Sequence, residues 1–249
     1  MKCISNSLKI AILGCLTLWI TAASGQTIVT DRPDQTESAA IVPLGMVQWE
    51  GGVLVQWEED RTTTDWMTPT SLVRLPIHQS LELRWVYNQH RRRSNESALG
   101  DGATSDMQVG AKWNLLDGTG TGGHMLALLS HWELPVSGGS GVPSSHKVSV
   151  RHNIGPDWAL AYNVGALLDD GWNGWMYTLS VGRGLGKGWS VFMEPFGSVT
   201  AEGTHLASAD AGFTWLHSDR IQWDWSMAVG LNHAFHYQSL GLSVLVGSE

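Results

Sequence analysis

The chain has 249 residues, of which 15 are Lys or Arg and 23 are Asp or Glu, so its formal net charge is −8. Charged residues make up only 15% of the sequence, below the roughly 25% that is usual in soluble domains, while 43% are hydrophobic and 14 are tryptophan. This composition excludes a disordered chain. The excess of acidic residues also argues against nucleic acid as a partner, because the chain lacks a positive electrostatic field that would attract phosphates.

Residues 1–25 have the features of a cleavable signal peptide. Lys2 and Lys9 precede the apolar run 10–20, and small residues follow it up to Gly25. The apolar run is shorter than the roughly 20 residues that a membrane-spanning helix needs, which disfavours an N-terminal anchor. Both cysteines lie in this segment. We therefore expect an exported protein without disulfides or thiolate metal sites.

Alternation with a period of two predicts β-strands through the rest of the chain. In segment 81–88, for example, Leu83 and Trp85 alternate with Glu82 and Arg84, so the two kinds of side chain leave the strand on opposite faces. About twelve strands are expected. Clear alternation occupies 47–58, 81–88, 106–113 and 221–230, weaker alternation 147–154, 189–194 and 209–215, and further strands are expected near 70–75, 125–134, 158–167, 175–183 and 237–246.

A soluble β-sandwich also alternates, but two features favour a membrane barrel. Tryptophans occur near strand ends among the apolar alternate positions, as in the aromatic girdles of outer-membrane barrels. Charged residues occupy the polar alternate positions in the middle of strands. In a barrel these positions face the lumen, where opposite charges can pair. The predicted fold class is therefore all-β, a transmembrane antiparallel up-and-down β-barrel of about 12 strands. It is expected to occupy 46–249, after an N-terminal periplasmic segment at 26–45.

The connections alternate in length, which is the outer-membrane pattern of long outer loops and short periplasmic turns. With twelve strands, both termini fall on the periplasmic side. The run Arg91–Arg93 is expected in the second long loop, where it either contacts anionic lipopolysaccharide or is simply solvated. Long connections are expected at 59–69, 89–104, 135–146 and 198–207, and tight turns at 76–80, 155–157, 184–188 and 217–220. The connection at 116–124 falls where a tight turn is expected but is longer than the other turns.

The first residues after the signal peptide carry a resemblance to a known family. Residues 30–38 read TDRPDQTES, and a VPLG turn at 42–45 and a QWEGG strand at 48–52 follow. This order resembles the opening of the outer-membrane transporter family named for the meta-pathway of phenol degradation. The resemblance implies a bacterial outer-membrane barrel that transports small solutes, with a gated conduit for hydrophobic or aromatic compounds as its suggested role. Unlike such barrels, this chain does not end on an aromatic residue but on Glu249.

No catalytic, cofactor-binding or metal site is predicted. The sequence contains neither G-x-S-x-G nor H-E-x-x-H, and the glycine run 182–188 stands where a tight hairpin turn is expected. The scattered histidines are interpreted as solvated loop residues. We do not expect an enzyme.

The charged residues at strand positions expected to face the lumen are the best candidates for a functional site. They predict either a narrow polar conduit or a barrel interior filled by paired charges. The mixed signs argue against a strongly anion-selective pore. The predicted lumen-lining residues are Glu50, Arg74, Glu82, Arg84, Asp106, Lys112, Arg151, Glu194 and Asp224.

A second candidate is the charged stretch before the first strand. Asp31, Arg32 and Asp34 either belong to a disordered tail or fold into the periplasmic mouth as a plug, where they would pair with lumen charges. The predicted function is a channel for passive passage of small molecules, with outer-membrane lipid and lipopolysaccharide as surroundings. The alternatives are a structural or adhesion barrel that acts through its outer loops, and a barrel-borne hydrolase.

Overall fold

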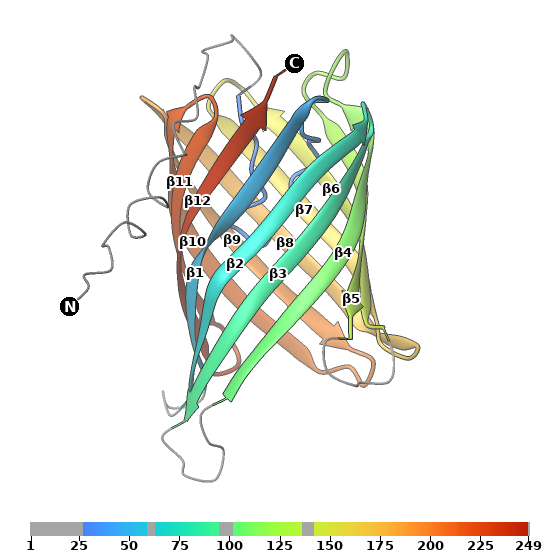
Figure 1. The fold of residues 1–249 in the computed structure, drawn as a ribbon, viewed down its shortest axis with the longest axis vertical. Helices are drawn as coiled ribbons and strands as arrows, with labels where there is room; N and C mark the ends of the chain where they lie inside the picture. Colours follow the sequence, from blue (N-terminus) through green and yellow to red (C-terminus); the bar gives the residue numbers. More distant parts are fainter. Residues whose placement is uncertain (1–26, 59–62, 95–101, 136–141, 249) are drawn as a thin grey trace, which may run out of the picture.

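The computed structural model describes residues 27–58, 63–94, 102–135 and 142–248, so the predicted signal peptide lies outside the described residues. Twelve antiparallel strands close into one barrel (Figure 1). The predicted fold class and strand number are confirmed. In the described part of the chain, no helix is long and apolar enough to cross a membrane.

Each strand pairs with its neighbours in sequence, and β12 pairs with β1 to close the barrel. The strands are β1 (Met46–Glu58), β2 (Thr63–His78), β3 (Leu81–Ser94), β4 (Gly102–Asp117), β5 (Met125–Leu134), β6 (Ser144–Ile154), β7 (Trp158–Leu168), β8 (Trp172–Gly186), β9 (Trp189–Thr200), β10 (His205–Ser218), β11 (Ile221–Gly230) and β12 (Phe235–Gly247).

The closing pair places both chain ends at one end of the barrel. Met46 at the start of β1 is the register partner of Gly247 at the end of β12. We call this the terminal end; it is uppermost in Figure 1, where β12 runs up to the C-terminus. At the opposite end of the barrel, Glu58 at the end of β1 is the register partner of Thr63 at the start of β2.

The period-two pattern determines which side chains face outward. Trp85 and Trp223 are 52% and 43% exposed on the outside, whereas Glu82, Arg84 and Asp224 on the same two strands are buried inside. Large apolar side chains are exposed in this way on all twelve strands. A closed sheet with an apolar outer face and a polar interior is the architecture of a transmembrane β-barrel.

Several strands are longer than predicted, so all four predicted long connections are too long. The stretches 59–69, 89–104, 135–146 and 198–207 each lose residues to strands. In particular, Arg91–Arg93 is not in a loop but in β3, where Arg93 is the register partner of Thr64. These strand ends carry polar residues, so hydropathy does not reveal them, but the hydrogen-bonded ladder continues through them.

Residues 27–45 do not join the sheet; most of them lie inside the barrel (blue in Figure 1). The segment enters at the terminal end, where the Ile28 amide donates to the Asp219 carbonyl oxygen at 2.8 Å. Two small apolar clusters hold it. Ile28 and Val42 pack with Met46 and Leu245, and Ala39 packs with Ala127 and Leu129. We call residues 27–45 the inner segment.

Candidate functional site

The carboxylate of Asp31 lies among three cations of neighbouring strands. Its Oδ2 atom is 2.6 Å from Arg84 Nη1, 3.0 Å from Lys112 Nζ and 3.7 Å from Arg74 Nε. The Ser38 amide donates to Oδ1 at 2.7 Å. Asp31 is 6% exposed and Arg74 and Lys112 are fully buried. A buried charge is tolerated only when it is paired and hydrogen-bonded, and here each of the four has partners.

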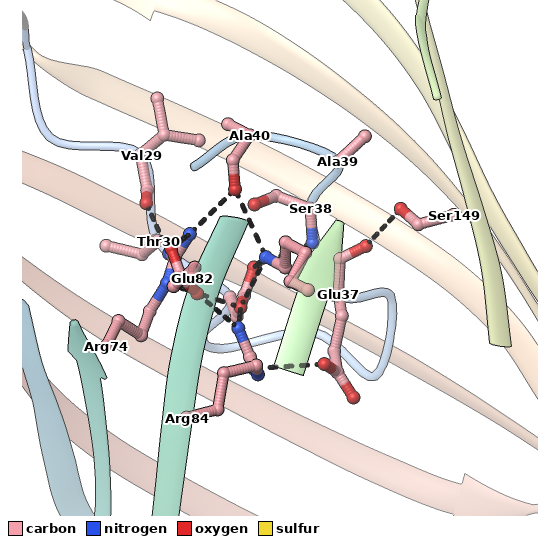
Figure 2. A network of polar contacts seen from close by, with 12 residues as sticks. Val29, Thr30, Glu37, Ser38, Ala39, Ala40, Arg74, Glu82, Arg84 and Ser149 are labelled. Atoms are coloured by element: carbon pink, nitrogen blue, oxygen red, sulfur yellow. Dashed lines mark hydrogen bonds and ion pairs between the residues drawn. The ribbon is translucent and has the colours of Figure 1, made fainter. Parts of the chain in front are cut away.

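Arg74 on β2 connects this carboxylate to two strand carboxylates and to the inner-segment backbone. Its Nε is 2.9 Å from Glu82 Oε1, and its Nη1 is 3.0 Å from Glu50 Oε1. It also donates to the carbonyl oxygens of Val29 and Ala40, both at 2.8 Å. Figure 2 shows Arg74 and Arg84 reaching Glu82 and the inner segment from neighbouring strands. The arginine therefore fixes two points of the inner segment at once.

Glu37 extends the contact toward β6 and β7. Its Oε2 is 3.0 Å from Arg84 Nη2, and Oε1 pairs with Lys147 Nζ. Its backbone oxygen accepts a hydrogen bond from Ser149 Oγ at 2.7 Å, and its amide donates to Asn163 Oδ1 at 2.8 Å. Both the side chain and the backbone of this residue are therefore held.

The inner segment also reaches the opposite wall of the lumen, at β8 and β9. The amide of Gln35 donates to Glu194 Oε2 at 2.6 Å, and the Thr36 hydroxyl donates to the same carboxylate. Thr36 Oγ1 lies 2.6 Å from Thr178 Oγ1. The inner segment therefore spans the lumen from β2–β4 to β8–β9.

Arg32 binds a third part of the wall. Its Nη2 is 3.1 Å from Asp224 Oδ1 and 2.7 Å from Ser239 Oγ. The guanidinium lies against Gly241, where an added Cβ would be 2.5 Å from Arg32 Nε and from Asp224 Oδ2. Gly241 is the register partner of Gly52 on β1, so two facing glycines leave the space that this ion pair occupies.

The charge states of the inner segment follow from these neighbours. Burial raises the pKa of Asp31, but the cations Arg74, Lys112 and Arg84 outweigh it and hold that pKa well below its usual range. Burial likewise raises the pKa of Glu37, and Lys147 contributes most to lowering it below the usual range. Asp34 forms no ion pair of this kind within the described residues. Burial and the nearby Glu194 raise its pKa well above the usual range.

The structure brings most of the predicted lumen-lining residues together around the inner segment. Asp106 and Arg151 are the exceptions. Asp106 pairs with His90 at 2.6 Å toward the opposite end, and Arg151 donates to Asn153 at 3.1 Å near the terminal end. Contacts to the inner segment come from Glu50, Arg74, Glu82, Arg84, Lys112, Glu194 and Asp224.

Sequence reasoning did not select several residues that take part in these contacts. Lys147 and Asn163 have the inward parity but were not singled out, and Glu37 was not among the plug candidates. Tyr237, whose hydroxyl donates to Asp210 Oδ2 at 2.6 Å, faces inward although it is aromatic. The period-two alternation could have identified Lys147 and Asn163 as inward-facing residues. No feature of the sequence indicated that Tyr237 faces inward.

Two cavities lie on either side of the inner segment. The cavity toward the terminal end has a volume of about 520 Å³, and the second, lined by Asn88 and Gln108 toward the opposite end, about 270 Å³. Arg32 and Asp34 line both. In the described residues, no group of three or more His, Cys, Asp or Glu could hold a metal ion.

No family model matches the chain, and no curated protein matches it, so membership in the phenol meta-pathway family stays a prediction. The fold is similar to solved barrels. An outer membrane channel from Pseudomonas putida F1 aligns with a TM-score of 0.63 and 12% identity, over 88% of this chain and 100% of that one. The KdgM porin in complex with oligogalacturonate aligns with a TM-score of 0.56 and 9% identity, over 80% and 98%. At these identities the likeness is one of fold.

The glycine beside Arg32 gives a specific test of the site. Gly241→Ala places a methyl group where the Arg32–Asp224 pair lies, so the pair must separate. Hydrogen bonds to charged groups contribute roughly 1.5–3 kcal/mol, so the Asp31 and Arg32 amides, which donate to Glu50, should exchange with solvent at least about tenfold faster. Hydrogen exchange followed by NMR measures this.

The matched control is Gly182→Ala, because a Cβ at Gly182 has its nearest neighbour at 3.9 Å. It should leave the exchange of both amides unchanged. Equal exchange rates in the two variants would show that the ion pair does not hold the inner segment.

Proposed function

We propose that the chain is an outer-membrane channel for passive passage of small molecules, narrowed by its inner segment. The observation that carries the proposal is the pair of cavities that the inner segment separates. A solute that moves from one cavity to the other passes Arg32 and Asp34, which line both. The fold likeness to a channel and a porin supports this function over a purely structural barrel.

The lining of the two cavities suggests the class of solute. Charged groups of both signs surround the inner segment, which is unlike the single-sign rings of strongly ion-selective pores. Apolar side chains are present as well: Leu72 and Val86 in the smaller cavity, Phe192 in the larger. Small solutes with both polar and apolar parts fit this lining. Aromatic and hydrophobic compounds are the solutes suggested by the family resemblance.

Deleting residues 27–38 tests the channel directly. The deletion removes Asp31, Arg32 and Glu37 from the lumen and joins the two cavities. Single-channel conductance in planar bilayers should therefore rise severalfold. The sheet itself should still close, because its ladder begins at Met46.

Two comparisons make the deletion interpretable. Folding of the deletion variant is checked by heat-modifiable migration, and Arg220→Gln in the β10–β11 turn serves as a substitution outside the lumen. Conductance that stays at the full-chain value in a folded deletion variant would contradict the proposal.

We also propose lipopolysaccharide as a lipid partner at the opposite end. Alternation along β3 places Asn88 and His90 inside, so Arg91 and Arg93 face outward, where both are exposed. Of the Lys and Arg residues that the structure describes, these are the two on the outer face at that end. Their guanidinium groups match the phosphate groups of the outer-leaflet lipid.

Binding of purified lipopolysaccharide to the folded protein tests this partner. Arg91→Gln combined with Arg93→Gln should weaken binding, and the loss should shrink at high salt, because exposed charges are screened. Arg220→Gln, at the terminal end, should not change it. Undiminished binding by the double variant would refute the partner.

A further inference from the structure

Arg151 differs from the other cations inside the barrel. Its Nε donates to Asn153 Oδ1 at 3.1 Å, and within the described residues no carboxylate lies within ion-pair distance of its guanidinium. A guanidinium carries five N–H donors, so most of its hydrogen-bonding capacity is unused by the described protein groups. By contrast, a carboxylate partner is present for each of the cations Arg32, Arg74, Arg84, Lys112 and Lys147.

Arg151 lines the cavity of about 520 Å³ at the terminal end. This hollow exists because the inward side chains of three adjacent strands are small. They are Ala159 and Ala161 on β7, Ser180 and Gly182 on β8, and Ser190 on β9. A Cβ built on Gly182 would meet its nearest atom only at 3.9 Å, so the wall has room for a ligand there.

The other charges around this cavity have their own partners or lie at its rim. Arg32 is paired with Asp224, and Arg183 lies over the ring of Trp158, 5.1 Å from its centroid. Asp34 interacts with Ser180 and acts on Arg151 through its charge, but Asp34 and Arg151 form no ion pair within the described residues. Asp157 lies in the exposed turn between β6 and β7. Arg151 is therefore the cation inside this part of the lumen that is available to an anion.

Apolar surface faces the same space. Phe192 on β9 and Pro33 of the inner segment line the cavity together with the two alanines of β7. A cavity of this size lies in the range of about 300–1,000 Å³ that is usual for small-molecule sites, which combine an apolar lining with a few polar anchors. The lining thus offers one cationic anchor and an apolar wall.

We propose that this cavity binds small organic monocarboxylates with an apolar body. The carboxylate pairs with the Arg151 guanidinium, whose planar fork matches its two oxygens, and the body packs on Phe192 and the small side chains of β7 and β8. The inference rests on the proposed channel function and deepens it, because it names the class of solute that the channel holds on its way through.

Isothermal titration of the folded protein in detergent, with benzoate as the probe, tests the site. Benzamide has the same shape without the charge and should bind at least about tenfold more weakly, since a charge-assisted hydrogen bond is lost. Arg151→Gln should weaken benzoate binding to the level of benzamide, and Arg151→Lys should have an intermediate effect. Gly182→Leu fills the hollow and should weaken both probes. Arg220→Gln should bind like the unaltered protein.

Benzoate binding no tighter than that of benzamide, or undiminished in folded Arg151→Gln, would overturn the proposal. Flux of an uncharged sugar into liposomes is measured on the same preparations. Sugar flux without a preference for benzoate refutes the ligand while leaving the channel intact. Benzoate binding without sugar flux supports the ligand site and refutes the channel.

Discussion

The structure depends on the need of buried charges for partners of opposite sign. Arg74, Arg84 and Lys112 stand on three adjacent strands inside the barrel, and their strand carboxylate partners are Glu50 and Glu82. Three cations facing two carboxylates leave one positive charge that burial makes costly. Asp31 of the inner segment supplies the missing negative charge, and its carboxylate lies near all three cations.

The other wall of the lumen has the opposite imbalance. Glu194, Asp210 and Asp224 are buried on β9, β10 and β11, and the inner segment brings Arg32 to Asp224. One short stretch thus carries an acidic residue toward the basic wall and a basic residue toward the acidic wall. This complementarity explains why a segment that contributes no strand has a defined path through the lumen, and why two separate cavities remain around it.

The sequence allowed the barrel and its faces to be predicted because both follow from a local rule. Period two is enough to place Glu82 and Arg84 inside and Trp85 outside. The partner of each inward charge is set by strand register and by the width of the lumen, which no local pattern contains. Asp31 and Lys112 are separated by 81 residues and meet only in the closed barrel.

The errors have similar physical causes. Arg91–Arg93 was expected in a loop because three charges interrupt the apolar alternation, yet the backbone ladder of β3 continues through them. Tyr237 was not singled out from the sequence; aromatic residues in barrels usually face lipid, but the hydroxyl of this one has a buried partner in Asp210. Arg151 had the right parity, but an unpaired cation differs from a paired one only through neighbours that the fold brings near.

The burial of the inner segment is most directly measured through the reactivity of a thiol at its centre. Ala39 is 0% exposed, and cysteine is a small side chain that fits such a site. In a chain whose own Cys3 and Cys15 are replaced by serine, Ala39→Cys should resist a water-soluble maleimide while the barrel is folded and react once it is unfolded in denaturant. Labelling of the folded barrel at the unfolded rate would contradict the account.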